Sequence, residues 1–296
     1  MKQCFVEKKF RPDNLALIYK INRIIEEYQE QGYELTLRQV YYQLVARGYI
    51  PNNERSYKNV GNLISEARLA GLIDWNAIVD RTRHLRKNTH WNSPKDILQA
   101  AANQYEIDKR ATQGIYIEVW VEKDALISIV EDVCSKLDVP CFSCRGYVSQ
   151  SEMYEAARRI KNQLNNEGKY EAFIIHLGDH DPSGIDMTRD IQERMDLFGA
   201  DVRVDRIALT WEQIELYNPP TNPTKLTDSR ATGYIEKYGY DCWELDALEP
   251  RVIEQLIIEA VTNLTDIDLY EDAKEKEQEE KNKLYEFIKK LEEDEE

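Results

Sequence analysis

The sequence predicts an α/β protein, in which a parallel sheet with helices on both faces follows a mainly helical unit. From Gln113 to Leu269, short apolar segments alternate with amphipathic ones, a pattern typical of a parallel sheet covered by helices. Before Arg110, apolar residues recur at helical rather than strand spacing. Because 296 residues suffice for about two domains, we expect three regions. These are residues 1–112, 113–269 and a charged tail, 270–296.

The N-terminal unit is predicted to contain three helices. Helical spacing covers residues 13–31, 36–47 and 56–70. Asp13 is a candidate N-cap for the first helix and Gly32 a candidate stop, while Thr36 is a good N-cap for the second. A basic, strand-like stretch follows at residues 71–91. This order favours a winged-helix variant of the helix-turn-helix, with a plain helical bundle as the alternative.

The middle region is predicted to alternate strands and helices. The expected strands are residues 115–121, 140–144, 172–177 and 202–209. The expected helices are residues 124–137, 149–164 and 185–198, the second with a capping box of Ser149 and Glu152. The tail is expected to form a solvated, charged helix.

Charge is distributed unevenly along the chain. The net charge is −16, which by itself argues against nucleic acid as a partner. From Thr36 to Lys95, however, there are ten Lys or Arg against four Asp or Glu, a net charge of +6. From Tyr270 to Glu296 there are six basic and twelve acidic residues, a net charge of −6. A basic block in an acidic chain favours a DNA-binding N-terminal unit.

The cysteines and the hydropathy bear on the compartment. Five cysteines, an odd number, and no apolar signal-like segment at the start favour reduced thiols in the cytoplasm. No apolar run is long enough to span a membrane, so no membrane partner is expected. Cys141 and Cys144 form a lone CxxC without further ligands at zinc spacing. We therefore expect packing residues there rather than a zinc site.

Carboxylates follow two of the expected strands. Glu122 comes directly after residues 115–121, and Asp179 and Asp181 come after residues 172–177 in the stretch HLGDHDPSGIDM. In open parallel sheets, ligands bind beyond the carboxyl ends of the strands. Three crowded carboxylates raise one another's pKa unless a cation binds, and oxygen ligands favour Mg²⁺ or Mn²⁺. The alternative is an ordinary turn with two solvated aspartates.

Two adjacent tyrosines lie in the second helix, within TLRQVYYQLVARG. At 100° per residue, Tyr41 falls on the apolar face and is expected to be buried. Tyr42 is expected at the flank, where it shares a face with Arg38 four residues earlier. A phenol beside a guanidinium on a basic surface is suited to meet a phosphate, whereas the alternative is a structural tyrosine at a helix margin.

Two of these motifs together resemble the Toprim domain. They are VEKDA at residues 121–125 and GDHDPSGID at residues 178–186. The DxDPxG form is similar to the A subunit of type IIB topoisomerases (topoisomerase VI) and its meiotic double-strand-break relatives. The resemblance covers residues 114–210 and extends to TLRQVYYQL. It departs from the family at Gln39, where an acid is common, and at Val148, where proline is expected.

The resemblance implies Mg²⁺-dependent cleavage of double-stranded DNA by tyrosine transesterification. It implies that Tyr42 is the nucleophile and that Glu122, Asp179 and Asp181 hold Mg²⁺ or Mn²⁺. Glu122 is also a candidate acceptor of the phenol proton, directly or through water, and Arg38 is the catalytic cation expected beside Tyr42. Lys123 is expected either to contact the phosphate or to form a structural salt bridge. A homodimer is implied, in which Tyr42 of one chain meets the acids of the other, and strand passage would need a separate ATPase subunit of the B type.

Other functions remain open from the sequence. A hydrolytic nuclease would use the same metal site with a structural Tyr42, and a DNA-binding regulator would use neither. The expected location is the cytoplasm, with association with the nucleoid or encoding by a phage or mobile element as further options. The residues expected to contact DNA phosphates are Lys58, Arg68, Arg81, Arg83, Arg86 and Lys87.

Overall fold

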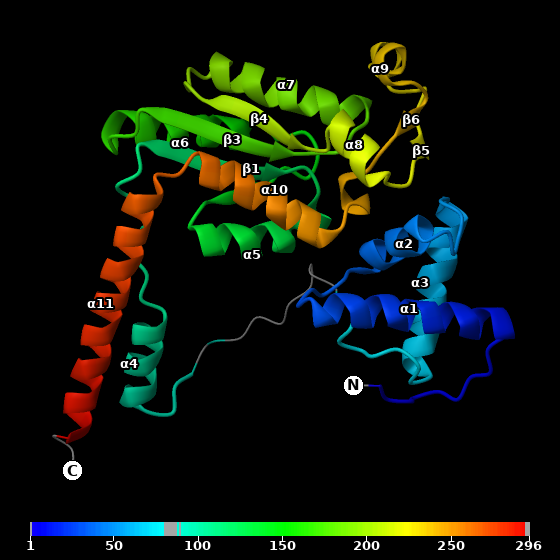
Figure 1. Ribbon diagram of the computed structural model, residues 1–296, viewed down its shortest axis with the longest axis horizontal. Helices are drawn as coiled ribbons and strands as arrows, with labels where there is room; N and C mark the ends of the chain where they lie inside the picture. Colours follow the sequence, from blue (N-terminus) through cyan, green and yellow to red (C-terminus); the bar gives the residue numbers. More distant parts are fainter. Residues whose placement is uncertain (1, 80–87, 89, 294–296) are drawn as a thin grey trace.

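A four-stranded parallel sheet forms the centre of the computed structural model, which describes residues 2–79, 88 and 90–293 (Figure 1). Its order is β2-β1-β3-β4. The strands are β1 (Ile115–Val121), β2 (Cys141–Ser143), β3 (Glu171–Leu177) and β4 (Arg203–Ala208). In the register of β1 with β3, Val121 lies opposite Leu177. The segments that follow these two strands therefore begin side by side.

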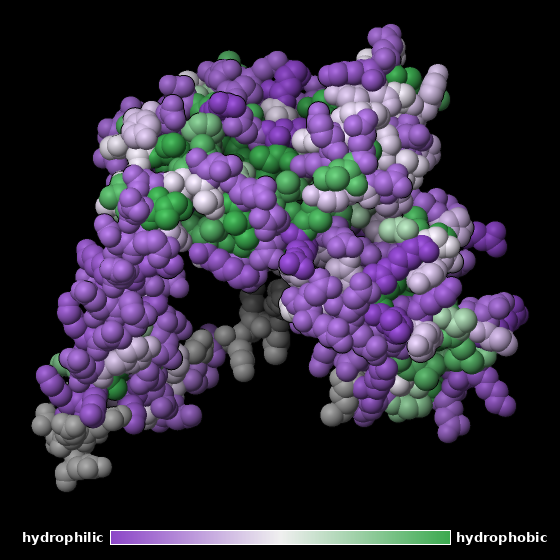
Figure 2. Space-filling view, viewed as in Figure 1, coloured by the Kyte–Doolittle hydropathy of each residue, from purple (hydrophilic) through white to green (hydrophobic). Residues whose placement is uncertain are grey.

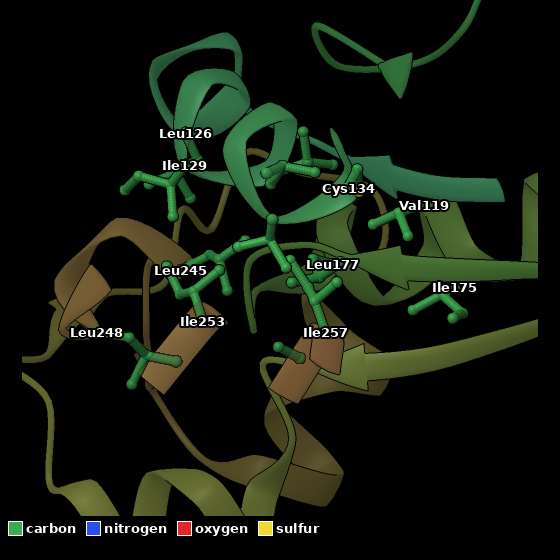
Figure 3. Packing of buried hydrophobic residues seen from close by; sticks show 14 of the residues in the cluster. Val119, Leu126, Ile129, Cys134, Ile175, Leu177, Leu245, Leu248, Ile253 and Ile257 are labelled. Carbon is green, nitrogen blue, oxygen red and sulfur yellow. The ribbon is translucent and has the colours of Figure 1, made fainter. Parts of the chain in front are cut away.

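Helices cover both faces of the sheet, which confirms the predicted α/β arrangement. Helices α5 (Ile127–Leu137) and α10 (Pro250–Asn263) share one apolar cluster with Val119, Ile175 and Leu177 (Figure 3). Helices α6 (Gln150–Asn166) and α7 (Pro182–Leu197) share another with Trp120 and Ile174. Successive residues of a strand point to opposite faces, so the mainly apolar strands β1 and β3 supply both clusters.

Three helices form the N-terminal unit, as predicted. They are α1 (Pro12–Glu30), α2 (Leu37–Ala46) and α3 (Glu54–Leu69). Thr36 and Gln39 make a capping box at the start of α2. The expectation that Asp13 caps α1 was wrong. Arg11 occupies the N-cap and Pro12 opens the helix, a position where proline's fixed φ and missing N–H cost nothing.

The strand-like stretch after α3 forms no strand within its described residues. Ile78 makes a single parallel bridge to Leu35, and its neighbour Val79 donates to the Leu35 carbonyl at 3.0 Å. Residues 80–87, which include four of the expected DNA contacts, lie outside the described part. The helical part of the N-terminal unit is therefore established, and a wing is not.

Helix α4 (Pro94–Asn103) packs against α11 (Ile267–Glu293), the helix predicted for the charged tail. Tyr285 donates to Asn103 at 2.8 Å, and Lys109, just after α4, forms an ion pair with Glu277 at 2.8 Å. The two helices project from the sheet as an arm, whose visible face is mainly hydrophilic (Figures 1 and 2).

The segment after β4 returns the chain to the N-terminal unit. It contains α8 (Trp211–Tyr217), β5 (Asn222–Pro223), α9 (Ala231–Tyr238), β6 (Asp241–Cys242) and the short 3₁₀ helix η2 (Leu245–Ala247). Helix α2 packs on η2, and Ala247 joins the apolar core of the N-terminal unit. Among the described residues, no helix combines the length and apolar character needed to cross a bilayer.

Candidate functional site

The carboxyl ends of β1 and β3 bring together two of the three predicted metal acids. Glu122 donates its backbone N–H to Leu177 at 2.8 Å, and its Oε2 accepts the backbone N–H of Asp179 at 2.8 Å. Two adjacent parallel strands thus end in one place, and the side chain of Glu122 holds the start of the loop after β3. The predicted proximity of Glu122 and Asp179 is confirmed.

Asp181 opens helix α7. Its Oδ1 accepts the backbone N–H of Gly184 and, at 2.9 Å, the hydroxyl of Ser183, an N-cap arrangement completed by Pro182 at the first helical position. Gly184 is required by close packing, because a Cβ there would lie 2.2 Å from the Asp179 carbonyl oxygen. The turn therefore holds both aspartates against the sheet end.

Lys123 occupies the centre of a group of carboxylates. Its Nζ lies 2.9 Å from Asp179 Oδ2, 2.6 Å from Glu244 Oε2 and 3.2 Å from Asp246 Oδ1. The salt-bridge alternative for Lys123 is the one that the structure contains. Glu244 and Asp246 were not predicted as site residues, and the signal available in the sequence was the acid pair in WELDALEP.

Arg206 of β4 braces the loop after β3 from the other side. Its guanidinium donates to the backbone carbonyls of Gly178 at 2.8 Å and Gly184 at 2.9 Å, to Asp179, and to the Thr188 hydroxyl at 3.1 Å. Sequence reasoning missed this residue, although an arginine within an otherwise apolar strand end was a usable signal.

The carboxylates at this end of the sheet are held in an unfavourable state. Burial raises the pKa of Asp179 to about 7 against the opposing attraction of Lys123, and nearby Glu122 raises it further. Burial also raises the pKa of Glu122, with a contribution from Asp181. Both shifts arise because negative charge is crowded where water is scarce, and a bound cation would relieve them.

The donor set fits a hard divalent cation in chemistry, because Glu122, Asp179 and Asp181 supply only carboxylate oxygens. The side chains are not arranged as metal ligands. Within the described residues, no three His, Cys, Asp or Glu side chains converge in metal-binding geometry. The Asp179 oxygens are engaged by Lys123 and, at 2.8 Å, by the backbone N–H of Leu245. Metal binding here would require Asp179 to exchange a partner.

Both tyrosines of α2 are buried, each with 4 % of its surface exposed. The expectation that Tyr42 lies at an exposed flank was wrong, because η2 packs over that flank of α2. The predicted proximity of Arg38 and Tyr42 is confirmed, since the guanidinium lies 5.6 Å from the ring centre. Arg38 also forms ion pairs with Glu244 and Asp246.

Asp246 and Glu244 are the acids that act on the Tyr42 hydroxyl. Burial raises the pKa of Tyr42 above its ordinary value, and Asp246 and Glu244 raise it further. For Glu244, burial acts to raise the pKa, but Lys123 and Arg38 outweigh it and lower the pKa to about 2. The pair is therefore a protonated phenol donating to a carboxylate.

The two histidines near the acids are both internal. His176 in β3 is fully buried, and its Nδ1 lies 2.8 Å from the Thr188 hydroxyl. His180 is 1 % exposed, and its Nδ1 lies 2.8 Å from the Tyr234 hydroxyl. It is packed within aromatic rings. The rings are Trp211, Tyr234, Tyr238 and Trp243.

Two of the six expected DNA contacts lie in the described part of the chain. Lys58 is exposed on α3 and pairs with Glu54 at 2.7 Å. Arg68 donates to the backbone carbonyls of Trp75, at 3.1 Å, and Ile78, so its guanidinium braces the segment after α3. The phosphate contact expected for Arg68 stays a prediction. Arg81, Arg83, Arg86 and Lys87 lie outside the described residues.

Comparison with protein-family models and with curated proteins finds no match to this chain. The resemblance to the Toprim domain therefore remains a prediction from the two sequence motifs.

Proposed function

We propose that the protein cleaves DNA by tyrosine transesterification at the carboxyl end of the sheet, in the manner of a type IIB topoisomerase A subunit. The observation that carries the proposal is the junction of α2 with η2. It brings Tyr42 and Arg38 to Glu244 and Asp246, and Lys123 connects these acids to Asp179. A phenol, two cations and an acid-rich strand end thus meet within one chain.

In this proposal the Tyr42 oxygen attacks a backbone phosphorus. A 5′-phosphotyrosyl bond forms, the bond to the 3′ oxygen breaks, and the phenol proton passes to water, which returns a proton to the leaving 3′ oxygen. Arg38, already against the Tyr42 ring, would contact the phosphate. A Mg²⁺ ion held by Glu122, Asp179 and Asp181 would stabilise negative charge on the phosphate and the leaving oxygen. Resealing reverses these steps without ATP.

The burial of Tyr42 sets a condition on this chemistry. A phosphate can reach the hydroxyl only after η2 separates from α2, which requires Arg38 to leave Glu244 and Asp246. The implied homodimer, in which Tyr42 serves the acids of a second chain, would also need this separation. The cleaving state is thus proposed to be more open than the arrangement described above.

A covalent-adduct assay tests the proposal. Supercoiled DNA is incubated with Mg²⁺ and the reaction is resolved on a denaturing gel. Protein–DNA adducts are expected with the wild type, and they should be lost in Tyr42→Phe. Tyr41→Phe is the matched control, because Tyr41 is equally buried but hydrogen-bonds to Asn52 and the Asn53 backbone. Adducts that persist in Tyr42→Phe would assign the nucleophile elsewhere.

A hydrolytic nuclease is the second candidate, favoured by the burial of Tyr42 and the raised pKa of its hydroxyl. Water would then attack the phosphate and Tyr42 would only support the junction. Cleavage that survives in Tyr42→Phe but disappears in Asp179→Asn selects this function. If the protein is instead a regulator that binds DNA without cleaving it, binding should be independent of Mg²⁺ and no substrate should be cleaved.

A further inference from the structure

A second group of cations lies on the N-terminal unit, away from the junction. Its members surround a concavity of about 450 Å³ between α1 and the segment after α2. The concavity is lined by Ala16, Tyr19, Lys20, Arg23, Arg47 and Tyr49. Three of these residues are cations and none is acidic, which is unusual in a chain with a net charge of −16.

Helical spacing places the α1 members on one face. Ala16, Tyr19, Lys20 and Arg23 follow the i, i+3, i+4, i+7 pattern, so their side chains point in the same direction. Small Ala16 leaves room at one end. Tyr19 is 64 % exposed, so its ring is available to a ligand.

The end of α2 brings the other two members to the same place. Gly48 turns the chain with a φ of +67°, and the Tyr49 backbone N–H returns to the Leu44 carbonyl at 2.9 Å. Lys20 Nζ consequently lies 4.1 Å from the centre of the Tyr49 ring. Arg47 is fixed by Glu27 at 2.8 Å. The position of Tyr49 is thus set by the backbone rather than by a flexible loop.

From this geometry we infer that Tyr19, Lys20, Arg23, Arg47 and Tyr49 form a site for single-stranded DNA, here called the basic tyrosine patch. Proteins that bind single strands without sequence preference combine cations along the backbone with aromatic rings on which bases stack. Lys20 and Arg23 supply phosphate contacts, and the exposed rings of Tyr19 and Tyr49 supply stacking surfaces. Bases within a duplex are already stacked, so the patch favours unpaired strands.

The patch is distinct from the proposed cleavage site. Arg47 follows Tyr42 by five residues, about 7.5 Å along the helix axis, and five residues rotate its direction well away from that of Tyr42. Arg38 and Tyr42 face η2, whereas Arg47 faces α1. A strand on the patch therefore lies beside the reacting phosphate and not at it, so the inference holds whichever chemistry the acids perform.

Binding of a labelled oligothymidine in EDTA, followed by fluorescence anisotropy at stepped salt, tests the inference without metal or cleavage. The combined variant Lys20→Gln with Arg23→Gln is expected to bind at least tenfold more weakly than wild type. The slope of log affinity against log salt should become shallower by about 1.4, because each single-strand phosphate contact contributes about 0.7. Tyr49→Ala should weaken binding about tenfold through lost stacking.

The matched control is Lys136→Gln with Arg158→Gln, which removes two exposed cations that pair with acids on α5 and α6. It should keep wild-type affinity and slope, and circular dichroism checks that all variants are folded. A duplex of the same length should be affected less by Tyr49→Ala than the single strand is.

Three results would overturn the inference. They are wild-type affinity in the Lys20/Arg23 variant, an equal loss in the control, and an equal effect of Tyr49→Ala on duplex and single strand. Tyr42→Phe should bind oligothymidine normally. A failed adduct assay with an intact patch, or the reverse, therefore separates this inference from the proposed function.

Discussion

Two acidic regions of the molecule, Glu118 within β1 and the five acids at the carboxyl end of the sheet, differ in how fully they are neutralised. In the first, Glu118 of β1 accepts two hydrogen bonds on each oxygen, from Tyr116, Trp120 and both nitrogens of Arg159 that face it, at 2.8 to 2.9 Å. One carboxylate meets one guanidinium, and every oxygen is satisfied. Such an arrangement stabilises the fold and has no capacity for a ligand.

The second group, at the carboxyl end of the sheet, keeps an excess of negative charge. Five carboxylates share three cations there. The carboxylates are Glu122, Asp179, Asp181, Glu244 and Asp246, and the cations are Arg38, Lys123 and Arg206. The comparison teaches that burial of charge alone does not indicate a site, whereas burial with an unbalanced charge does.

The largest expected effect is on the pH dependence of stability, through Asp179. Its folded pKa of about 7 exceeds its ordinary value of 3.8, so the folded state binds a proton that the unfolded state releases. Stability from this group is therefore lost as pH rises from about 4 to 7. In EDTA, Asp179→Asn should gain up to about 4 kcal/mol relative to wild type between pH 4 and pH 8.

Urea unfolding at each pH measures this difference. Gln99→Ala on α4 offers a control, because it removes no titratable group and should keep a constant offset from wild type. If the Asp179→Asn offset is also constant with pH, the carboxyl end of the sheet is not the strained group that the comparison requires.

Glu118→Gln tests the neutralised group and should have the next largest effect. The amide presents donors to Trp120 and Arg159, which are donors themselves, so about 3 kcal/mol of unfolding free energy should be lost. Calorimetric titration with Mn²⁺ should give the same affinity as wild type. A variant that unfolds normally but loses Mn²⁺ would reverse the roles assigned to the two groups.

Part of the candidate site could be predicted from the sequence, and the part that could not has a physical explanation. Apolar runs predict the strands, and two adjacent parallel strands end at one edge, so the proximity of Glu122 and Asp179 could be anticipated. The packing of η2 on α2 could not, because helical spacing identifies a face of α2 but not the segment that covers it. Glu244, which reaches Tyr42 from 202 positions later in the chain, was missed for that reason.

A smaller effect is expected at the junction. Arg38→Gln removes the ion pairs to Glu244 and Asp246 that hold α2 on η2, at a cost of about 1 kcal/mol, because Arg38 is partly exposed. Hydrogen exchange of the α2 amides should become faster than in Arg47→Gln, which breaks a pair on the other side of the helix. Equal exchange in the two variants would show that apolar packing alone closes the junction.

The smallest effect is expected for Lys58→Gln. The pair with Glu54 is exposed to solvent, so the free energy of unfolding should stay close to that of wild type. For duplex DNA in EDTA, the salt slope should become shallower by about 0.9 if Lys58 contacts one phosphate. An unchanged slope removes Lys58 from the DNA interface and leaves the comparison of the two buried groups intact.

The amides of His180 and Trp243 exchange hydrogen bonds with each other's carbonyls at 2.9 and 3.0 Å. These two bonds, together with the hydrogen bond from the Leu245 backbone N–H to Asp179, connect the loop after β3 to η2. Any force that lifts η2 off the phenol must therefore pull on the aspartate loop as well. Exposure of the tyrosine and rearrangement of the acids at the end of the sheet would then occur together, and a ligand that binds at either place would change the other.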